Sequence, residues 1–159
     1  MKQSSQDSLN IVLIRGAALW LLAALALAWC LVGLNLGVPF LKAAFAGKQI
    51  RLLQAHIDFL LMTALILGIY AAKAPLQWTL RWSMVLGAFT NSSLFLLQAI
   101  FPALDAPVPA EGLFGEAFRL YLLASITMTT YGFGGAAIAI LWWTFRSSPA
   151  SSVIGERRS

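Results

Sequence analysis

The chain has 159 residues, of which 60% are hydrophobic and only 11% are charged, and its formal net charge is +5. Soluble domains are about half apolar and about one quarter charged, so this composition excludes an ordinary soluble protein and indicates an integral membrane protein. The basic residues form no stripe interleaved with aromatic side chains, which excludes nucleic acid as a partner. A basic excess of this kind is typical of loops held at anionic lipid, so the lipid bilayer is the expected partner.

Four apolar stretches follow one another, and each is long enough to cross the ~30 Å hydrocarbon core of a bilayer. They cover about residues 11–36, 52–72, 78–101 and 118–145. The sequence therefore predicts an all-α fold, an integral membrane four-helix bundle with a single four-span domain over residues 1–146. The Ser-rich segment 147–159 is expected to be a flexible tail. The first apolar stretch is too long for the core of a signal peptide and is expected to be retained.

The connections carry local signals of their own. Residues 40–45 form an amphipathic segment that is expected to lie in the membrane interface. Gly33 and Gly37 form a small-residue pair at a spacing that permits close approach of another helix. Pro102 is expected to end the third span, because proline cannot continue a helix. The polar segment 103–116 that follows is expected to form a solvated lid or turn.

An even number of spans places both termini on one side of the membrane. That side carries seven basic residues, Lys2, Arg15, Lys73, Arg81, Arg146, Arg157 and Arg158. The opposite side carries four, Lys42, Lys48, Arg51 and Arg119. Because cytoplasmic loops carry the excess of Lys and Arg, the bias predicts cytoplasmic N- and C-termini in a multi-pass protein of the bacterial inner (plasma) membrane.

The second span contains the only histidine, His56, and a carboxylate two residues later, Asp58. Titratable side chains are costly in hydrocarbon, so both are candidates for a functional site. Each helical step turns a side chain by ~100°, so His56 and Asp58 are expected to point apart. Asp58 shares a face with Arg51 and Gln54, and it is expected to pair with one of them, because buried charges are usually paired.

Two interpretations of His56 stay open. One is a hydrogen bond to a neighbouring helix; the other is a ligand to haem iron, for which imidazole is the usual proximal ligand. The second requires a ring nitrogen aimed at something other than a neighbouring main-chain oxygen. With one histidine and one cysteine, Cys30, the chain is not expected to build a dedicated zinc or di-iron site or an intrachain disulfide.

The third and fourth spans add two further patterns. Thr90 to Ser93 form a polar cluster at mid-membrane, with Gln98 on the same face as Asn91. The cluster fits hydrogen bonds between helices, or a contact from Asn91 to a substrate. Glycines within residues 132–135 are expected to allow close helix packing, because no strand precedes them and a nucleotide-binding loop would need one.

The motif Ala55-His56-Ile57-Asp58, the patch Thr90-Asn91-Ser92 and four spans in a chain of this size resemble the small membrane isomerases, the hydroxylaminobenzene mutases and styrene oxide isomerases. The resemblance covers mainly residues 54–102. It implies a homotrimer of four-helix subunits with haem b, whose iron takes His56 as axial ligand and acts as a Lewis acid. It also implies catalytic-site roles for Asn91, as a polar contact to substrate, and for Asp58, as a supporting carboxylate.

Two positions depart from the family pattern. Six residues after the histidine the family tends to have asparagine, and this chain has Met62. Four residues after the third-span asparagine the epoxide isomerases have tyrosine, and this chain has Phe95. The leading hypothesis is a haem-dependent isomerase or mutase of a small apolar substrate, such as an epoxide or an arylhydroxylamine. A non-catalytic haem- or quinone-binding subunit of a larger complex and a small transporter are the alternatives.

Overall fold

A computed structural model of the protein describes the backbone of residues 2–106 and 112–147. Side chains are described for residues 11–106 and 112–146. In chain order its elements are α1 (Lys2–Asn35), α2 (Pro39–Ala44), α3 (Gln49–Ala71), α4 (Trp78–Ile100), η1 (Pro102–Asp105), α5 (Leu113–Thr129), η2 (Thr130–Gly134) and α6 (Gly135–Ser147). The short element η1 is a 3₁₀-helix and η2 is a π-helical turn. The predicted all-α class is confirmed.

Four helical stretches are long and apolar enough to cross a membrane, which confirms the predicted number. They are Ile11–Asn35, Gln49–Ala71, Trp78–Ile100 and Leu113–Arg146. The fourth begins five residues earlier than the expected start at 118. Its first turns contain two charged residues, Glu116 and Arg119, which form an ion pair at 2.9 Å about one helical turn apart.

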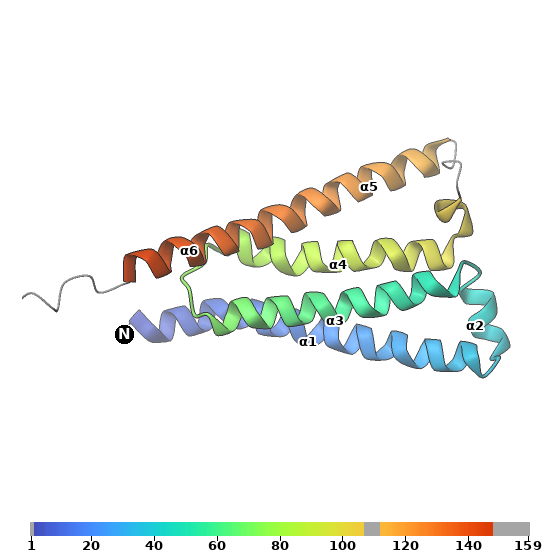
Figure 1. Ribbon diagram of the computed structural model, residues 1–159, viewed down its shortest axis with the longest axis horizontal. Coiled ribbons are helices and arrows are strands. Elements are labelled where there is room, and N and C mark those ends of the chain that lie inside the picture. Colours follow the sequence, from blue (N-terminus) through green and yellow to red (C-terminus); the bar gives the residue numbers. More distant parts are fainter. Residues whose placement is uncertain (1, 107–111, 148–159) are drawn as a thin grey trace, which may run out of the picture.

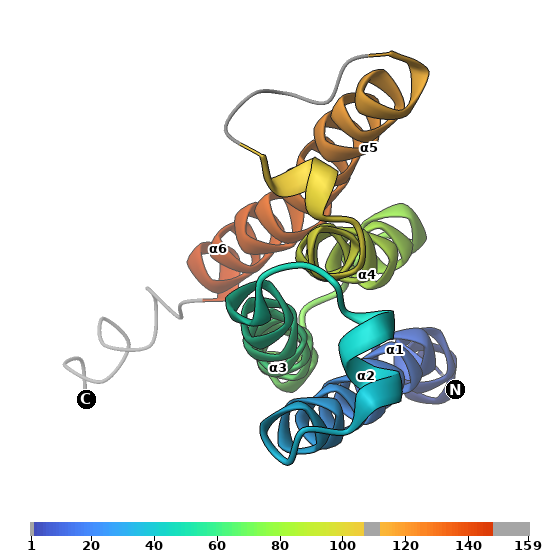
Figure 2. The same cartoon turned by 90° about the vertical axis from the view of Figure 1, so that its right-hand side faces the viewer.

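The helices α1, α3 and α4 pack side by side, and α5, η2 and α6 together form a fourth rod outside them. Figure 1 shows α1, α3 and α4 running along one another, while α5, η2 and α6 form one long rod beside α4. Seen end-on in Figure 2, α5 diverges from α3 and α1. The start of α1 and the end of α6 lie at one end of the bundle, and α2 and η1 lie at the other (Figure 1).

The core lies between α1, α3 and α4 and has two clusters. The cluster nearer the chain ends includes Leu13, Ile66 and Met84, and the other includes Leu52 and Phe59. Trp20 touches both clusters. Its Nε1 donates a hydrogen bond to the main-chain oxygen of Val85 at 3.1 Å, and its ring stacks on Phe89 with the centroids 5.0 Å apart.

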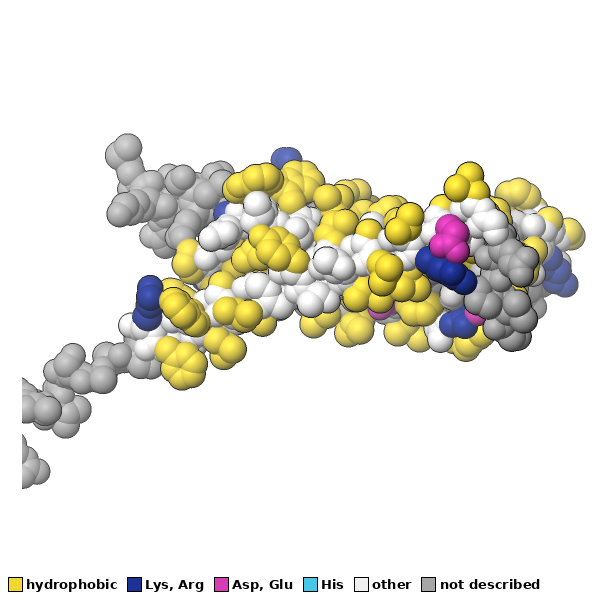
Figure 3. Space-filling view, turned by 90° about the horizontal axis from the view of Figure 1, so that it is seen from above, with side chains coloured by type: hydrophobic (Ala, Val, Ile, Leu, Met, Phe, Trp, Pro, Cys, Tyr) yellow, Lys and Arg dark blue, Asp and Glu magenta, His cyan; other side chains and the backbone are white. Residues whose placement is uncertain are grey.

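The outer surface is apolar along the middle of the rods. Figure 3 shows hydrophobic side chains over that region, with Lys, Arg, Asp and Glu gathered mostly toward the ends on this face. Large side chains such as Leu22, Trp29 and Leu120 are more than 60% exposed. In water such a surface would drive aggregation, whereas lipid solvates it, so the exposed residues fit a membrane environment.

The glycines at the end of α1 and those of the fourth rod have different roles. Gly37 has a φ of +81° and ends α1, with its N–H and that of Val38 bonded back to Leu34 and Gly33. A Cβ on Gly33 would lie 2.4 Å from Leu41 Cδ1. Gly37 thus forms a helix C-cap, and Gly33 allows the close approach of another helix, as predicted; that helix is the short α2.

The glycines of the fourth rod do serve close helix packing, as predicted. A Cβ on Gly132 would lie 2.6 Å from the main-chain nitrogen of Met84, and one on Gly87 would lie 2.9 Å from Thr129 Cα. The backbones of α4 and of the fourth rod therefore meet directly. Such close crossings are common between membrane helices, where small residues replace bulky side chains at the contact.

Candidate functional site

The two titratable side chains of α3 face different helices. His56 Nδ1 lies 2.9 Å from the main-chain oxygen of Ala24 in α1. Asp58 Oδ2 accepts hydrogen bonds from Asn91 Nδ2 at 2.9 Å and from Ser92 Oγ at 2.8 Å, both in α4. The prediction that His56 and Asp58 point apart is confirmed. The structure brings Asp58 and Asn91 together and leaves His56 outside their network.

The contact of His56 defines what its ring can do. A carbonyl oxygen only accepts, so Nδ1 carries the proton and a neutral imidazole then has its lone pair on Nε2. Within the described residues Nε2 has no hydrogen-bond partner. The bond to Ala24 confirms the expected hydrogen bond to a neighbouring helix. The same bond, from Nδ1 to a carbonyl, also orients many histidines that bind metals through Nε2.

The expected partner of Asp58 was wrong. Arg51 instead donates from Nη1 to Gln54 Oε1 at 2.8 Å and forms an ion pair with Asp105, which lies 54 residues further along the chain. Helical spacing places Arg51 on the same face of α3 as Gln54 and Asp58, but it contains no information about η1, which supplies Asp105. Asp58 is therefore satisfied by the two neutral donors of α4, and it has no cationic partner among the described residues.

Asp105 anchors the end of the bundle opposite the chain termini. Besides the pair with Arg51, its Oδ2 lies 2.9 Å from Lys48 Nζ, and only 6% of its side chain is exposed. Hydrogen bonds from Arg51 and then from Lys48 lower the pKa of this carboxyl to about 2. The segment expected to be a solvated lid thus begins as η1 and is tied to α3. Residues 107–111 of that segment lie outside the described residues.

The polar cluster of α4 bridges two neighbours. Asn91 and Ser92 contact α3 through Asp58, while Ser93 Oγ lies 2.6 Å from the hydroxyl of Tyr121 in α5. The expected hydrogen bonds between helices are thus confirmed. Tyr121 was missed in the sequence, since only the placement of α5 on α4 identifies it as a partner of the cluster.

The remaining polar groups show what this region offers chemically. Asn91 uses its Nδ2 on Asp58, and its Oδ1 accepts no hydrogen bond from the described residues. The amide is therefore fixed at one end and has an open acceptor at the other. Asp58 is a carboxylate whose Oδ2 accepts from two donors, which fixes its orientation toward α4. No group of three or more His, Cys, Asp or Glu side chains that could hold a metal ion gathers in the described part of the chain.

His56 fits a haem more readily than a bare metal ion, because a haem iron needs only one axial ligand from the protein. The space inside one chain is nevertheless filled around this residue. Ala24, Leu52 and Ala55 are fully buried and Phe59 is 2% exposed. A haem bound through Nε2 would therefore have to lie outside this packed interface, against the half-buried edge of α3.

Comparisons of the chain with protein-family models, with curated proteins and with solved structures each found no match.

Proposed function

We propose that the protein is a membrane isomerase or mutase of small apolar substrates that holds haem b through Nε2 of His56. The observation that carries the proposal is an imidazole inside a membrane span, with Nδ1 engaged by the carbonyl of Ala24 at 2.9 Å and Nε2 without a partner among the described residues. Titratable groups within spans are mostly functional. The resemblance of the His56 and Asn91 motifs to the small membrane isomerases supports the same assignment.

The residues of the chain have separate tasks in this proposal. The carbonyl of Ala24 fixes the orientation of the His56 ring and leaves Nε2 as the nitrogen that can bind iron. When bound, ferric haem would supply a Lewis acid for a substrate oxygen. Asn91 offers its free Oδ1 to a hydroxyl or N–H group of the substrate, and Asp58 keeps that amide in place. An arylhydroxylamine has such donors and an epoxide has none, so these contacts favour the mutase reaction.

The cofactor site is proposed to form between copies of the chain. The interior beside His56 is filled by residues such as Ala24, Ala55 and Phe59, so one chain alone does not enclose a haem. A homotrimer, as the resemblance implies, would cover the edge of α3 with a second copy. The proposed location is the bacterial inner (plasma) membrane, with the chain ends in the cytoplasm, where the basic residues are in excess.

The test is an absorption spectrum of the protein purified in detergent after expression with ample haem. The wild type is expected to show a Soret band. His56→Ala removes both ring nitrogens, whereas His56→Asn keeps an N–H donor near the position of Nδ1 and removes only Nε2. If Nε2 binds iron, both variants lose the band. A matched control is Gln77→Asn, an exposed amide at the start of α4, which is expected to keep it.

The two variants also separate ligation from a structural role. A wild type that is colourless, or a His56→Asn variant that retains the full Soret band, would contradict the proposal. A structural role alone predicts that His56→Asn behaves as the wild type and that His56→Ala is destabilised by about 1 kcal/mol, the typical net contribution of one hydrogen bond. Oligomeric state is measured on the same samples by mass photometry.

A further inference from the structure

The two ends of the bundle differ in how their basic side chains are paired. At the end formed by η1 and the start of α3, Asp105 pairs with Lys48 and Arg51. Three basic residues near the chain termini have no carboxylate partner within the described part of the chain, and they are Lys73, Arg81 and Arg146. Positive charge is therefore neutralised at one end of the bundle and left uncompensated at the other.

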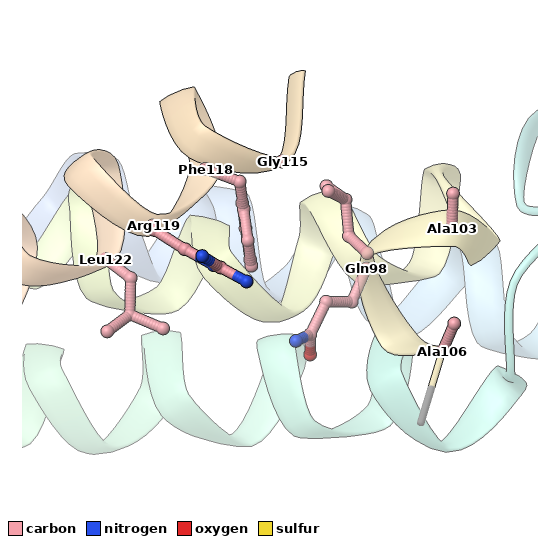
Figure 4. A pocket seen from close by; sticks show the side chains of 8 residues that line it. Gln98, Ala103, Ala106, Gly115, Phe118, Arg119 and Leu122 are labelled. Atoms are coloured by element: carbon pink, nitrogen blue, oxygen red, sulfur yellow. The ribbon is translucent and has the colours of Figure 1, made fainter. Parts of the chain in front are cut away.

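A pocket at the neutralised end illustrates the contrast. It has a volume of about 280 Å³ and lies between η1, the end of α4 and the start of α5 (Figure 4). Its lining includes Gln98, Phe118, Arg119 and Leu122. The guanidinium of Arg119 lies 2.9 Å from Glu116 Oε1, so the two charges cancel at the rim. This pair leaves the rim without net positive charge to attract an anion.

At the other end, the uncompensated charge of Arg146 lies beside an apolar groove on α6. Trp142, Phe145 and Arg146 line this groove, which has a volume of about 230 Å³. Their spacing of three and four residues places them on one face of the helix. Trp142 is 63% exposed and Phe145 is 78% exposed, so most of each ring faces away from the rest of the chain. A cavity of about 150 Å³ is enough for benzene, so the groove has room for a short stretch of an acyl chain.

The guanidinium of Arg146 is held at the rim of this groove. Its Cζ lies 4.9 Å from the centroid of the Trp142 ring, within the range of a cation–π contact. An aromatic ring offers no oxygen acceptor, and the N–H donors of Arg146 form no hydrogen bond within the described residues. A guanidinium is suited to bind phosphate through two parallel N–H···O bonds. The ring of Trp142 thus positions the cation and leaves its donors available to an anion.

The groove lies at the depth where a phospholipid changes from hydrocarbon to headgroup. Arg146 is the last residue of the fourth candidate span, Leu113–Arg146. Trp142 lies one helical turn deeper, and tryptophans are enriched at this level of the membrane interface. A phosphate bound at Arg146 would therefore place the first carbons of its acyl chain against Trp142 and Phe145.

We propose that this groove binds one anionic phospholipid, with its phosphate on the guanidinium of Arg146 and the start of one acyl chain against the two rings. A lipid with a net negative charge is favoured over a zwitterionic one, because the positive charge at this end of the bundle is uncompensated. The site goes beyond the proposed function, since neither His56 nor Asp58 lines it and no cofactor is needed for binding.

The proposal is tested by native mass spectrometry of the full chain in detergent, titrated with phosphatidylglycerol or with phosphatidylcholine of the same acyl chains. The wild type is expected to bind the first phosphatidylglycerol about fivefold more tightly, the ratio typical of one basic residue at an anionic membrane surface. Arg146→Gln removes the charge from an exposed position and is expected to bind the two lipids equally. Phe145→Ala removes one wall of the groove and is expected to weaken both lipids alike, so that the ratio is kept.

The matched control is Arg119→Gln, which removes the same charge from an exposed position of the same rod, where the guanidinium pairs with Glu116. It is expected to keep the fivefold ratio. Equal affinity of the wild type for the two lipids, or an unchanged ratio in Arg146→Gln, would overturn the proposal. A ratio lost equally in Arg119→Gln would also contradict it, because net charge and not the groove would then determine binding. The Soret band reports on His56 and not on this titration, so failure of one proposal is distinguishable from failure of the other.

Discussion

The three helices α1, α3 and α4 hold together differently from the rod formed by α5, η2 and α6. Between the three, large side chains interlock, with Phe59 and Leu52 fully buried or nearly so and Trp20 packed across both core clusters. Against the rod, α4 presents Gly87, and the rod presents Gly132, so backbone meets backbone over a narrow strip. Within the described elements α5 packs mainly on α4, whereas α1, α3 and α4 each pack on at least two other spans.

Because of this difference, the two interfaces should be sensitive to opposite kinds of substitution. A core filled by large side chains loses much free energy when one is truncated, because a cavity remains. A contact between small residues depends on close approach and is most sensitive to added atoms. The candidate site of Asp58 and Asn91 lies between α3 and α4, where large side chains fill the interface, while the pocket at Gln98 lies between α4 and α5.

The largest effect is expected from truncating the core. Phe59→Ala removes a ring that is 2% exposed and packs against Trp20, so the free energy of unfolding should fall by ~3 kcal/mol or more. Leu61→Ala is the control on the same helix, since Leu61 is 51% exposed, and it should cost less than ~1 kcal/mol. Titration with SDS in mixed micelles, followed by circular dichroism, measures both. Similar losses would show that the core does not dominate.

Adding one carbon to the strip between α4 and the rod should have the next largest effect. A Cβ on Gly132 would lie 2.6 Å from the main-chain nitrogen of Met84, so Gly132→Ala forces the backbones apart and should cost about 2 kcal/mol. Gly134→Ala adds the same atom where nothing lies within 4 Å, and it should be neutral or slightly stabilising. The same SDS titration compares them, and equal behaviour would mean that close packing does not attach the rod.

A smaller effect is expected from the hydrogen bond that joins α5 to α4. Tyr121→Phe removes the hydroxyl that lies 2.6 Å from Ser93 Oγ, and hydrogen bonds between membrane helices contribute ~0.6 kcal/mol on average. A double-mutant cycle with Ser93→Ala isolates this contribution from the effect of each change alone. A coupling energy near zero would show that the pair does not help to hold α5.

The remaining effect is recognised by its pH dependence and should come from Asp105, which ties η1 to the start of α3 outside the spans. Its folded-state pKa of about 2 lies below the ordinary value of 3.8, so its stabilising contribution is present above about pH 4 and is lost as the pH falls through 2. Asp105→Asn should therefore be less stable than the wild type at pH 5, with the gap closing toward pH 2. Unfolding titrations at pH 5, 3.5 and 2 measure this. A gap that stays constant would contradict the assigned pKa.

Much of the fold follows from local sequence, and much of the site does not. Hydropathy gives four spans because each helix must satisfy its own backbone in lipid, and helical spacing separates His56 from Asp58. The charged partner of Arg51 comes from η1 and the donors to Asp58 come from α4, so no spacing within α3 could reveal them. The pair Gly33 and Gly37 fits a close helix contact and a helix cap equally well in sequence, and the structure shows one of each, a contact of Gly33 with Leu41 of α2 and a cap at Gly37.

The π-helical turn Thr130–Gly134 determines how the fourth rod would respond to the deletion of a residue. A turn of this kind holds about one residue more than an α-helical turn, and each residue rotates the following helix by about 100°. Deleting a single residue there would remove the wide turn and restore a continuous α-helix, while the side chains of α6, including Trp142 and Arg146, would keep nearly their present azimuth. A deletion in the regular α-helical turns of α5 or α6 has no wide turn to absorb it, so it would rotate the helix beyond it by about 100° and change which side meets the neighbouring helices and which meets the acyl chains.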